Sequence, residues 1–269
     1  MSTYRYATAS LWLGLCLSLG LFPAAGWEGP LPPAKPVATA AAGKEPLPVA
    51  DPVDFLHQCL ERYDRQQIQG YRLVMQKQER IRRKRGPLEV IEVWFRAKPY
   101  SVFMHWLAGA RQAASVLYVA GENNGPMLVH PTGLAGTLVK VVTRDPEGPE
   151  ARREGRYSIK EFALRATQER TWNDWKAAKE QGTLRVEYLG VEKVKPAGDR
   201  ACYALRRTQE PDADGVTEVI VYIDRETRFQ VGTVLRGDRG ELIGEYMYRD
   251  IHLNPEFKPG QFTAAALEP

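Results

Sequence analysis

The feature that most constrains the fold is a run of closely spaced short strands near the C-terminus. β-Branched and aromatic residues recur there in short stretches, separated by turn-forming segments such as 224–228 and 237–240. Parallel strands need crossover connections of roughly a dozen residues, so these strands must pair as an antiparallel meander. The predicted strands are 184–194, 202–208, 217–223, 229–235 and 241–251.

Two helices and further strands precede this run. Asp51 followed by Pro52 predicts the start of a helix that ends before Gly70, and the capping box of Ser158 and Glu161 predicts the start of a second helix. The predicted segments are helices 52–69 and 158–182, strands 71–79, 88–96, 101–107, 114–120, 127–130 and 138–143, and a loop at 144–156.

The predicted fold class is therefore mainly β (α+β), with a single antiparallel sheet of about ten strands and two helices. The run Asn123-Asn124-Gly125 predicts a tight hairpin, because these residues tolerate positive φ. A sheet of so many strands must curl and so presents a concave face that something has to cover.

The N-terminus has the pattern of an export signal. An uncharged apolar run at 11–22, too short to span a bilayer, is followed by small residues at Ala24 and Gly26. We expect a signal peptide at 1–26 with cleavage after Gly26; a lipoprotein signal using Cys16 is the alternative. Segment 27–50, rich in proline and alanine, predicts a disordered linker, which leaves 51–269 as one domain.

Charge and cysteine content limit the partners. A net charge of +4 is too mild to indicate nucleic acid. Cys59 and Cys202 remain after the predicted cleavage and could form a disulfide in an oxidising compartment, or stay as buried free thiols. Only His57 lies near a cysteine at ligand-like spacing, so no metal site is predicted.

Nothing in the sequence supports catalysis. The chain has no G-x-S-x-G, H-E-x-x-H or paired-cysteine motif, and its histidines are scattered singly. We therefore expect no enzyme activity and no cofactor. The four histidines are His57, His105, His130 and His252.

The C-terminal stretch resembles the lipoprotein-localisation carriers of the LolA/LolB type, and the domain is most similar to the exported domain-of-unknown-function family 1571. The motifs are the D-x-x-T turn at 224–227 and the tail residues Tyr246, Tyr248, Asp250, Leu253, Asn254, Pro255, Phe257 and Phe262. The resemblance implies an incomplete antiparallel barrel with helices over its open mouth, enclosing an apolar cavity for acyl chains. It assigns no individual ligand-contacting residue.

Large aromatic side chains on the strands and on the second helix are the candidate ligand-binding residues, although such rings are commonest in plain cores. Trp172 and Trp175 share one helix face, where the resemblance places a lid, so this helix is predicted to cover the cavity with both rings beneath it. The candidates are Trp94, Phe103, Trp106, Tyr118, Trp172, Trp175, Tyr222 and Tyr246.

A basic run sits at the predicted tip of the first hairpin. It could contact anionic lipid head groups, or it could be a solvated tip whose charges discourage edge aggregation. The run consists of Arg80, Arg82, Arg83, Lys84 and Arg85.

The sequence thus favours an exported protein of the periplasm or cell envelope that binds a lipid, acyl chain or other apolar ligand in a helix-covered half-barrel, as a carrier or sensor. An envelope or membrane-surface partner fits this hypothesis. The alternative is a non-enzymatic structural or interaction module of the envelope with a filled core. A pocket of several hundred Å³ would favour the first and a packed interior the second.

Overall fold

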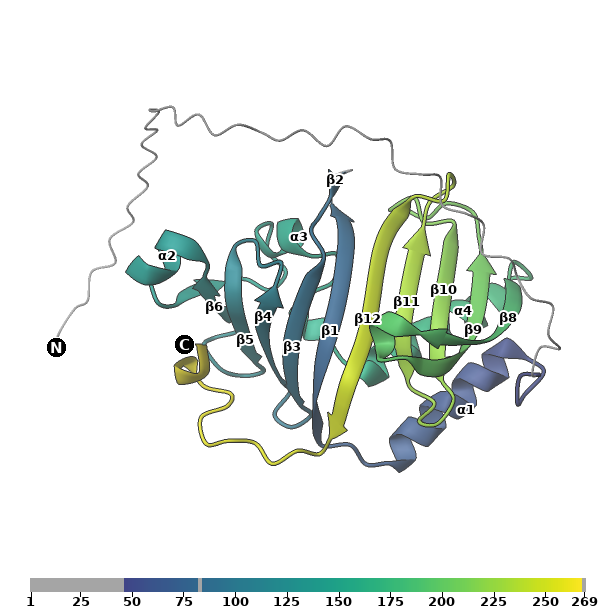
Figure 1. The fold of residues 1–269 in the computed structure, drawn as a ribbon, viewed down its shortest axis with the longest axis horizontal. Helices are drawn as coiled ribbons and strands as arrows, with labels where there is room; N and C mark the ends of the chain where they lie inside the picture. The colour runs from purple at the N-terminus through teal and green to yellow at the C-terminus, as the bar shows by residue number, and fades with distance from the viewer. Residues whose placement is uncertain (1–45, 82–83, 268–269) are drawn as a thin grey trace. The chain divides into compact units, whose positions relative to one another are not determined.

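The computed structural model describes residues 46–81 and 84–267, and these residues form one sheet with helices on one of its faces (Figure 1). Every neighbouring pair of strands is antiparallel, as predicted. The strand order is β7-β6-β5-β4-β3-β1-β12-β11-β10-β9-β8, with β2 paired to β1 outside this path. β7 and β8 are the two edges, so the sheet is curled but not closed.

The strands are β1 (Gly70–Ile81), β2 (Lys84–Arg85), β3 (Glu89–Arg96), β4 (Ser101–Ala108), β5 (Ala113–Val119), β6 (Met127–Pro131), β7 (Val142–Arg144), β8 (Arg185–Val194), β9 (Arg200–Thr208), β10 (Glu218–Asp224), β11 (Gln230–Arg236) and β12 (Leu242–Leu253). The helices are α1 (Pro52–Arg65), α2 (Gly133–Leu138), α3 (Ala151–Glu154) and α4 (Leu164–Glu180), with 3₁₀ turns η1 (Ile159–Glu161), η2 (Lys195–Ala197) and η3 (Ala264–Leu267).

Local signals placed most of these elements correctly. The Asp51 side chain accepts hydrogen bonds from the backbone N–H groups of Val53 and Asp54, so α1 begins where the cap predicts. Asn123 and Asn124 have φ of 55° and 57° in the turn between β5 and β6, which confirms the predicted hairpin.

The sequence prediction was wrong where helices are short. The predicted strand 138–143 begins at the last residue of α2 and contains a strand only from Val142, in the three-residue β7, while the predicted loop 144–156 contains α3. Ser158 caps the 3₁₀ turn η1 rather than a long helix, because Phe162 and Ala163 return to extended backbone before α4 begins. Helices of four to six residues have too little periodicity to be recognised.

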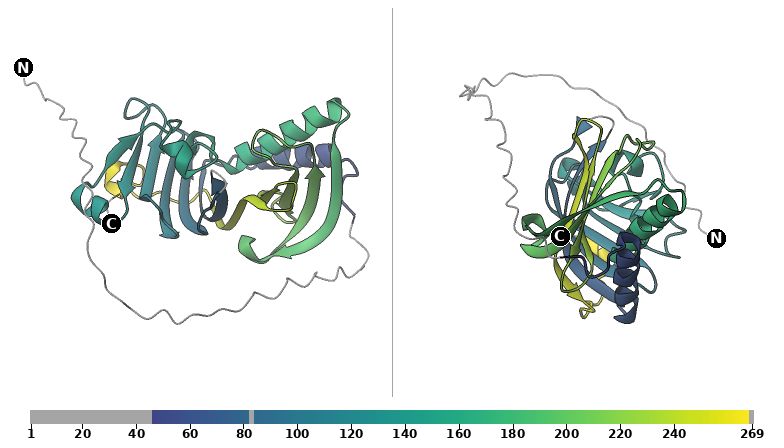
Figure 2. Two further views of the ribbon diagram at one scale, coloured as in Figure 1. Left: turned by 90° about the horizontal axis from the view of Figure 1, so that it is seen from above. Right: turned by 90° about the vertical axis from the view of Figure 1, so that its right-hand side faces the viewer.

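The helices α1 and α4 lie side by side over β8–β11 on the concave face (Figure 2). Their apolar side chains pack against alternate residues of β9 and β10, and Asp64 and Arg165 form an ion pair between the two helices. The cluster consists of Val53, Phe55, Leu56, Cys59, Trp175, Tyr203, Leu205, Val221 and Ile223.

The linker prediction needs a correction at its C-terminal end. Leu47 and Val49 are half-buried against the cluster beneath α1, because their apolar side chains alternate with exposed Pro46 and Pro48. The predicted signal peptide, Cys16 and the rest of the predicted linker lie outside the described residues.

The predicted disulfide is absent, and both cysteines are buried free thiols. Cys59 packs with Tyr203 and Leu205 on the concave face, whereas Cys202 belongs to a different cluster, which also contains Val194 and Ala197. Successive residues of a strand point to opposite faces, so Cys202 points away from its neighbour Tyr203 and from α1.

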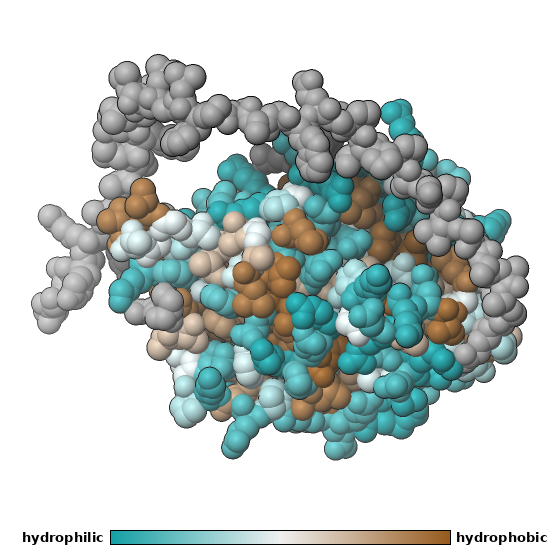
Figure 3. All heavy atoms as spheres, viewed as in Figure 1, coloured by the Kyte–Doolittle hydropathy of each residue, from teal (hydrophilic) through white to brown (hydrophobic). Residues whose placement is uncertain are grey.

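The convex face over β3–β5 is covered by the C-terminal tail. Phe257, Phe262 and Leu267 pack against Phe103 and Leu117. On the side viewed in Figure 1, hydrophobic residues otherwise form separate groups among hydrophilic ones, and α2 carries the two exposed leucines Leu134 and Leu138 (Figure 3).

Candidate functional site

A cavity of about 660 Å³ lies on the concave face, and Thr167 and Arg170 of α4 are among the residues that line it. Its floor consists of alternate residues of β1, β3, β4, β5 and β6, which the antiparallel register places in adjoining rows. The apolar floor residues are Met75, Ile91, Met104, Trp106, Val116, Met127 and Val129. A volume of this size lies within the range of pockets that hold small molecules, roughly 300–1,000 Å³.

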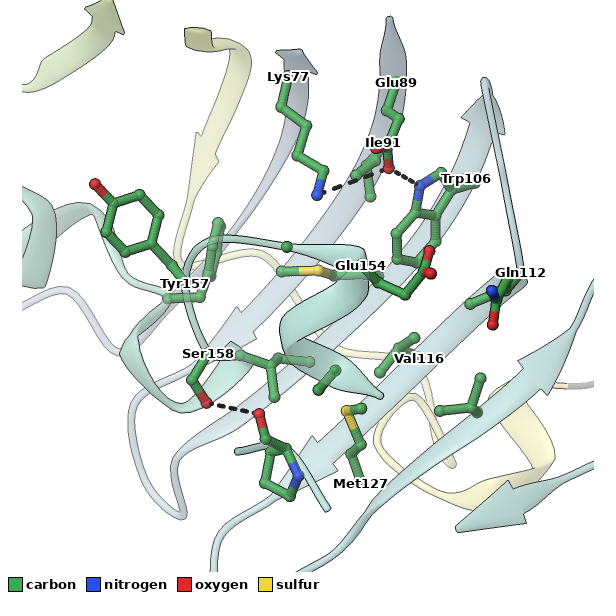
Figure 4. Close-up of a pocket in the computed structure, with 18 of the residues that line it drawn as sticks. Lys77, Glu89, Ile91, Trp106, Gln112, Val116, Met127, Glu154, Tyr157 and Ser158 are labelled. Atoms are coloured by element: carbon green, nitrogen blue, oxygen red, sulfur yellow. Dashed lines mark hydrogen bonds and ion pairs between the residues drawn. The ribbon is translucent and has the colours of Figure 1, made fainter. Parts of the chain in front are cut away.

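The roof is the segment around α3, which crosses in front of the strands (Figure 4). Ser158 Oγ donates to the carbonyl oxygen of Pro146 at 3.3 Å, which ties the two ends of this segment together. The Tyr100 hydroxyl lies 2.8 and 2.7 Å from the carbonyl oxygens of Ile159 and Phe162, so it anchors the segment to the sheet.

One end of the floor is charged. Lys77 on β1 lies between two buried glutamates, with its Nζ 3.4 Å from Glu79 and 3.7 Å from Glu89. Trp106 Nε1 donates to Glu89 Oε2 at 2.6 Å, and the Tyr246 hydroxyl donates to Glu79 Oε1 at 2.6 Å. These contacts join four strands at the polar end of the cavity (Figure 4).

Arg111 extends this network toward the roof. Its Nε lies 3.7 Å from Glu89 Oε1, and its Nη2 lies 3.5 Å from Glu154 Oε2 and donates to the Glu154 backbone carbonyl. The roof helix α3 is therefore held to the floor through one arginine. We name Lys77, Glu79, Glu89, Arg111 and Glu154 the charged cluster.

Burial also shifts the acidity of the tyrosines at this end. The pKa of Tyr246 is well above its usual range, because the ring is buried and its hydroxyl faces the carboxylate of Glu79. Burial raises the pKa of Tyr248 in the same direction. Both phenols are neutral at physiological pH, so Tyr246 can act as the hydrogen-bond donor to Glu79.

A smaller cavity of about 190 Å³ lies under α4. Arg156 Nε, Arg207 Nε and Gln230 Oε1 are buried there without a hydrogen-bond partner. Tyr157 and Tyr246 border both cavities. The polar lining is suited to ordered water rather than to an apolar ligand.

Two of the eight aromatic candidates, Trp106 and Tyr246, line the large cavity. Tyr118 lies on the same face, buried beside the floor, with its ring 6.0 Å from that of Tyr100. The structure brings these three to one region. Their role in ligand binding stays a prediction.

Three other candidates point to the convex face. Trp94 and Phe103 pack under the C-terminal tail, and Trp94 Nε1 donates to Glu92. Tyr222 packs against Gly232. A larger residue at position 232 would place its Cβ atom 2.9 Å from the Tyr222 ring. None of the three lines the large cavity.

Helix α4 does not place its tryptophans over the large cavity. Trp175 is only 1% exposed, in the cluster shared with α1, and borders the smaller cavity. Trp172 stacks on His57 of α1 at 4.8 Å. The roof is instead formed around α3, a segment that the sequence had indicated as a loop.

The basic tip is only partly described. Arg80 forms an ion pair with Glu241, and Arg85 donates to Gln78, while Lys84 is exposed. Arg82 and Arg83 lie outside the described residues.

The sequence analysis missed the charged cluster. Met75, Lys77 and Glu79 alternate with residues of the other face, so the period of two that identified β1 also carried this signal. Charged residues at strand ends normally face water, and the pattern alone does not show that they turn inward.

Residues 68–267 match a protein family described as a protein of unknown function, DUF1571. The chain belongs to the DUF1571 family. No curated protein is significantly similar to this DUF1571 chain in sequence.

Several solved structures resemble the chain in fold. MucB is 19% identical, with 80% of this chain and 63% of MucB covered and a TM-score of 0.45. The Mycobacterium tuberculosis lipoprotein LppX is 10% identical, covering 77% and 96%, with a TM-score of 0.44. The LolA superfamily protein NE2245 from Nitrosomonas europaea is 10% identical, covering 77% and 97%, with a TM-score of 0.33.

This DUF1571 chain thus spans less than two thirds of the length of MucB. Its own open, curled antiparallel sheet with helices over the concave face has the LolA-like half-barrel architecture that the sequence resemblance implied. The structure corrects the element count to twelve strands and four α-helices among the described residues.

Neither a membrane-spanning helix nor a metal-binding group is found in the part of the chain that the structure describes. None of its helices has the length and apolar character needed to cross a membrane. Its His, Cys, Asp and Glu side chains form no group of three that could hold a metal ion.

Proposed function

We propose that this DUF1571 chain binds a lipid, an acyl chain or a similar apolar ligand in the cavity between the β1–β6 floor and the α3 roof. The observation that carries the proposal is the cavity of about 660 Å³ on a floor built mostly from aliphatic and methionine side chains. Methionine adapts its shape to varied apolar ligands, which suits three such side chains on one binding floor.

The proposed setting is the bacterial envelope. The apolar run and small residues near Gly26 support export by a cleaved signal peptide, and the basic hairpin tip supports contact with an anionic membrane surface. We propose a carrier or sensor rather than an enzyme, with a membrane-surface or envelope protein as its partner and without nucleic acid.

The test is to occupy the cavity with a larger side chain. Met104 is half-buried, with its side chain on the floor, so Met104→Trp should fill part of the space. We expect at least about tenfold weaker binding of the neutral fluorescent probe N-phenyl-1-naphthylamine, since displaced volume removes apolar contacts.

Leu107→Trp is the matched control. Leu107 lies on the same strand but faces outward and is 54% exposed. This variant should bind the probe as the wild type does, and both variants should keep their melting temperatures. Equal probe binding by Met104→Trp and the wild type would contradict the proposal.

A further inference from the structure

The charged cluster places two nearly buried carboxylates at the polar end of the cavity. The side chains of Glu79 and Glu89 are 4% and 5% exposed, and each faces Lys77. Glu154 adds a third carboxylate, and Arg111 is the second cation. Three negative groups therefore share two positive ones, so no cation of this cluster is left over for a ligand's negative charge.

The cluster nevertheless has free hydrogen-bonding capacity. Glu89 Oε2 accepts from Trp106, but no described residue donates a hydrogen bond to Glu89 Oε1, whose nearest cation, Arg111 Nε, is 3.7 Å away. Arg111 Nε is itself buried without a hydrogen-bond partner. Arg111 Nε is enclosed by protein, which leaves Glu89 Oε1 as the free acceptor at the polar end of the floor.

The free acceptor suits a neutral head that donates a hydrogen bond. A hydroxyl or amide N–H can donate to Glu89 Oε1. A carboxylate head would bring a fourth negative charge to a poorly solvated site, where like charges repel strongly.

We propose that the cavity selects acyl chains with an uncharged, hydrogen-bonding head group, such as a glycerol ester or an N-acyl amide, and disfavours free fatty acids. This inference rests on the proposed function of the cavity. The acyl chain would run from the charged cluster across the apolar floor toward Val116 and Met127.

The other arginines that line the cavity do not reverse this preference for uncharged head groups. Arg144 pairs with Glu150, and Arg170 pairs with Glu161. Arg153 lines the cavity but is exposed to solvent, where a single charge attracts a carboxylate only weakly.

The experiment compares ligands with the same oleoyl chain. Monooleoylglycerol and N-oleoylethanolamine carry neutral heads, whereas oleate and N-oleoylglycine carry carboxylates. Each is titrated against protein loaded with N-phenyl-1-naphthylamine. We expect each neutral ligand to displace the probe at a concentration about tenfold lower than that of its anionic counterpart.

Glu89→Gln tests the residue that causes the preference. It removes one buried negative charge and keeps an acceptor for Trp106, so the difference between neutral and anionic ligands should shrink severalfold. Glu122→Gln is the matched control, because it also removes one carboxylate, but Glu122 is exposed and does not line the cavity. Melting temperatures establish that both variants fold.

The outcomes separate the two proposals. Failure of all four ligands to displace the probe, together with unchanged probe binding by Met104→Trp, would defeat the proposed function. Displacement by oleate at the same or a lower concentration than monooleoylglycerol would overturn the head-group inference and leave apolar binding intact. This comparison uses the wild-type protein, so it decides the question even where Glu89→Gln does not fold.

Discussion

The two halves of the sheet meet the same requirement, a covered concave face, in different ways. Over β8–β11, the helix-covered half, α1 and α4 supply Phe55, Leu56 and Trp175, which pack against β9 and β10 and leave the smaller cavity of about 190 Å³ beside Trp175. Over β1 and β3–β6, the cavity half, Tyr71, Leu73 and Phe95 pack with Leu164 at one end of the strands, whereas the α3 segment leaves a cavity at the other end. The number of helix side chains that pack on the concave face, rather than the strands themselves, decides which half is more solid.

The largest expected difference between the halves is in stability. Trp175→Ala should lower the free energy of unfolding by about 3–5 kcal/mol, because it removes a ring that is 1% exposed in a packed core. Met104→Ala in the cavity half should cost only about 1 kcal/mol, because one side of Met104 already adjoins open space. Urea unfolding of both variants measures the two costs.

Equal costs for these two substitutions would remove the distinction between a solid and a hollow half. The binding assay supplies the converse comparison. Trp175→Ala should leave probe affinity nearly unchanged at temperatures where the variant is folded, whereas Met104→Ala should change it.

The second prediction tests the packing around Cys59 and Cys202 through their acidity. Burial raises the pKa of each thiol to about 12, from about 9 in the unfolded chain. The folded state therefore holds both protons above pH 9 while the unfolded state loses them, so stability is complete below pH 9 and falls as the pH rises toward 12. Urea midpoints measured from pH 8 upward should decrease accordingly.

Thiol titration sharpens this prediction. In a chain beginning at Pro46, folded protein at pH 8 should react very slowly with a disulfide reagent, and denatured protein should release two equivalents. Cys202→Ala should reduce both the alkaline slope and the thiol count. Release of no thiol on denaturation would indicate a disulfide and contradict the arrangement on opposite faces.

The smallest expected effect concerns the N-terminal edge of the helix-covered half. Leu47 and Val49 extend its core, so a chain beginning at Ala50 should be about 1–2 kcal/mol less stable than one beginning at Pro46. Thermal unfolding of the two chains gives the difference. Identical melting temperatures would show that these two side chains add nothing to the core.

The sequence alone determined the features that depend on local chemistry. Asp51 capped α1, the asparagines between β5 and β6 produced a hairpin, and Asp224 produced the predicted turn by accepting from the backbone N–H of Glu226. Short connections favoured antiparallel pairing and the number of strands predicted a curled sheet, while the open, incomplete barrel was implied by the family resemblance. These features need only neighbouring residues, whose preferences are readable from the chain.

Only the tertiary structure decided which face carries the large cavity. A period of two separates the faces of a strand, but it does not say which face a helix will cover. Trp94 and Trp106 are both large aromatic rings on strands, yet the first lies under the C-terminal tail and the second on the cavity floor.

The charged cluster and the two free thiols also depend on the tertiary structure. Lys77 and Glu89 meet because the register pairs β1 with β3, and Trp106 reaches Glu89 because β4 follows in the sheet. Cys59 and Cys202 stay apart because Cys59 lies on α1 over the concave face, whereas Cys202 of β9 points to the opposite face. Such contacts join residues distant in sequence, so their physical cause lies in strand register and in helix placement.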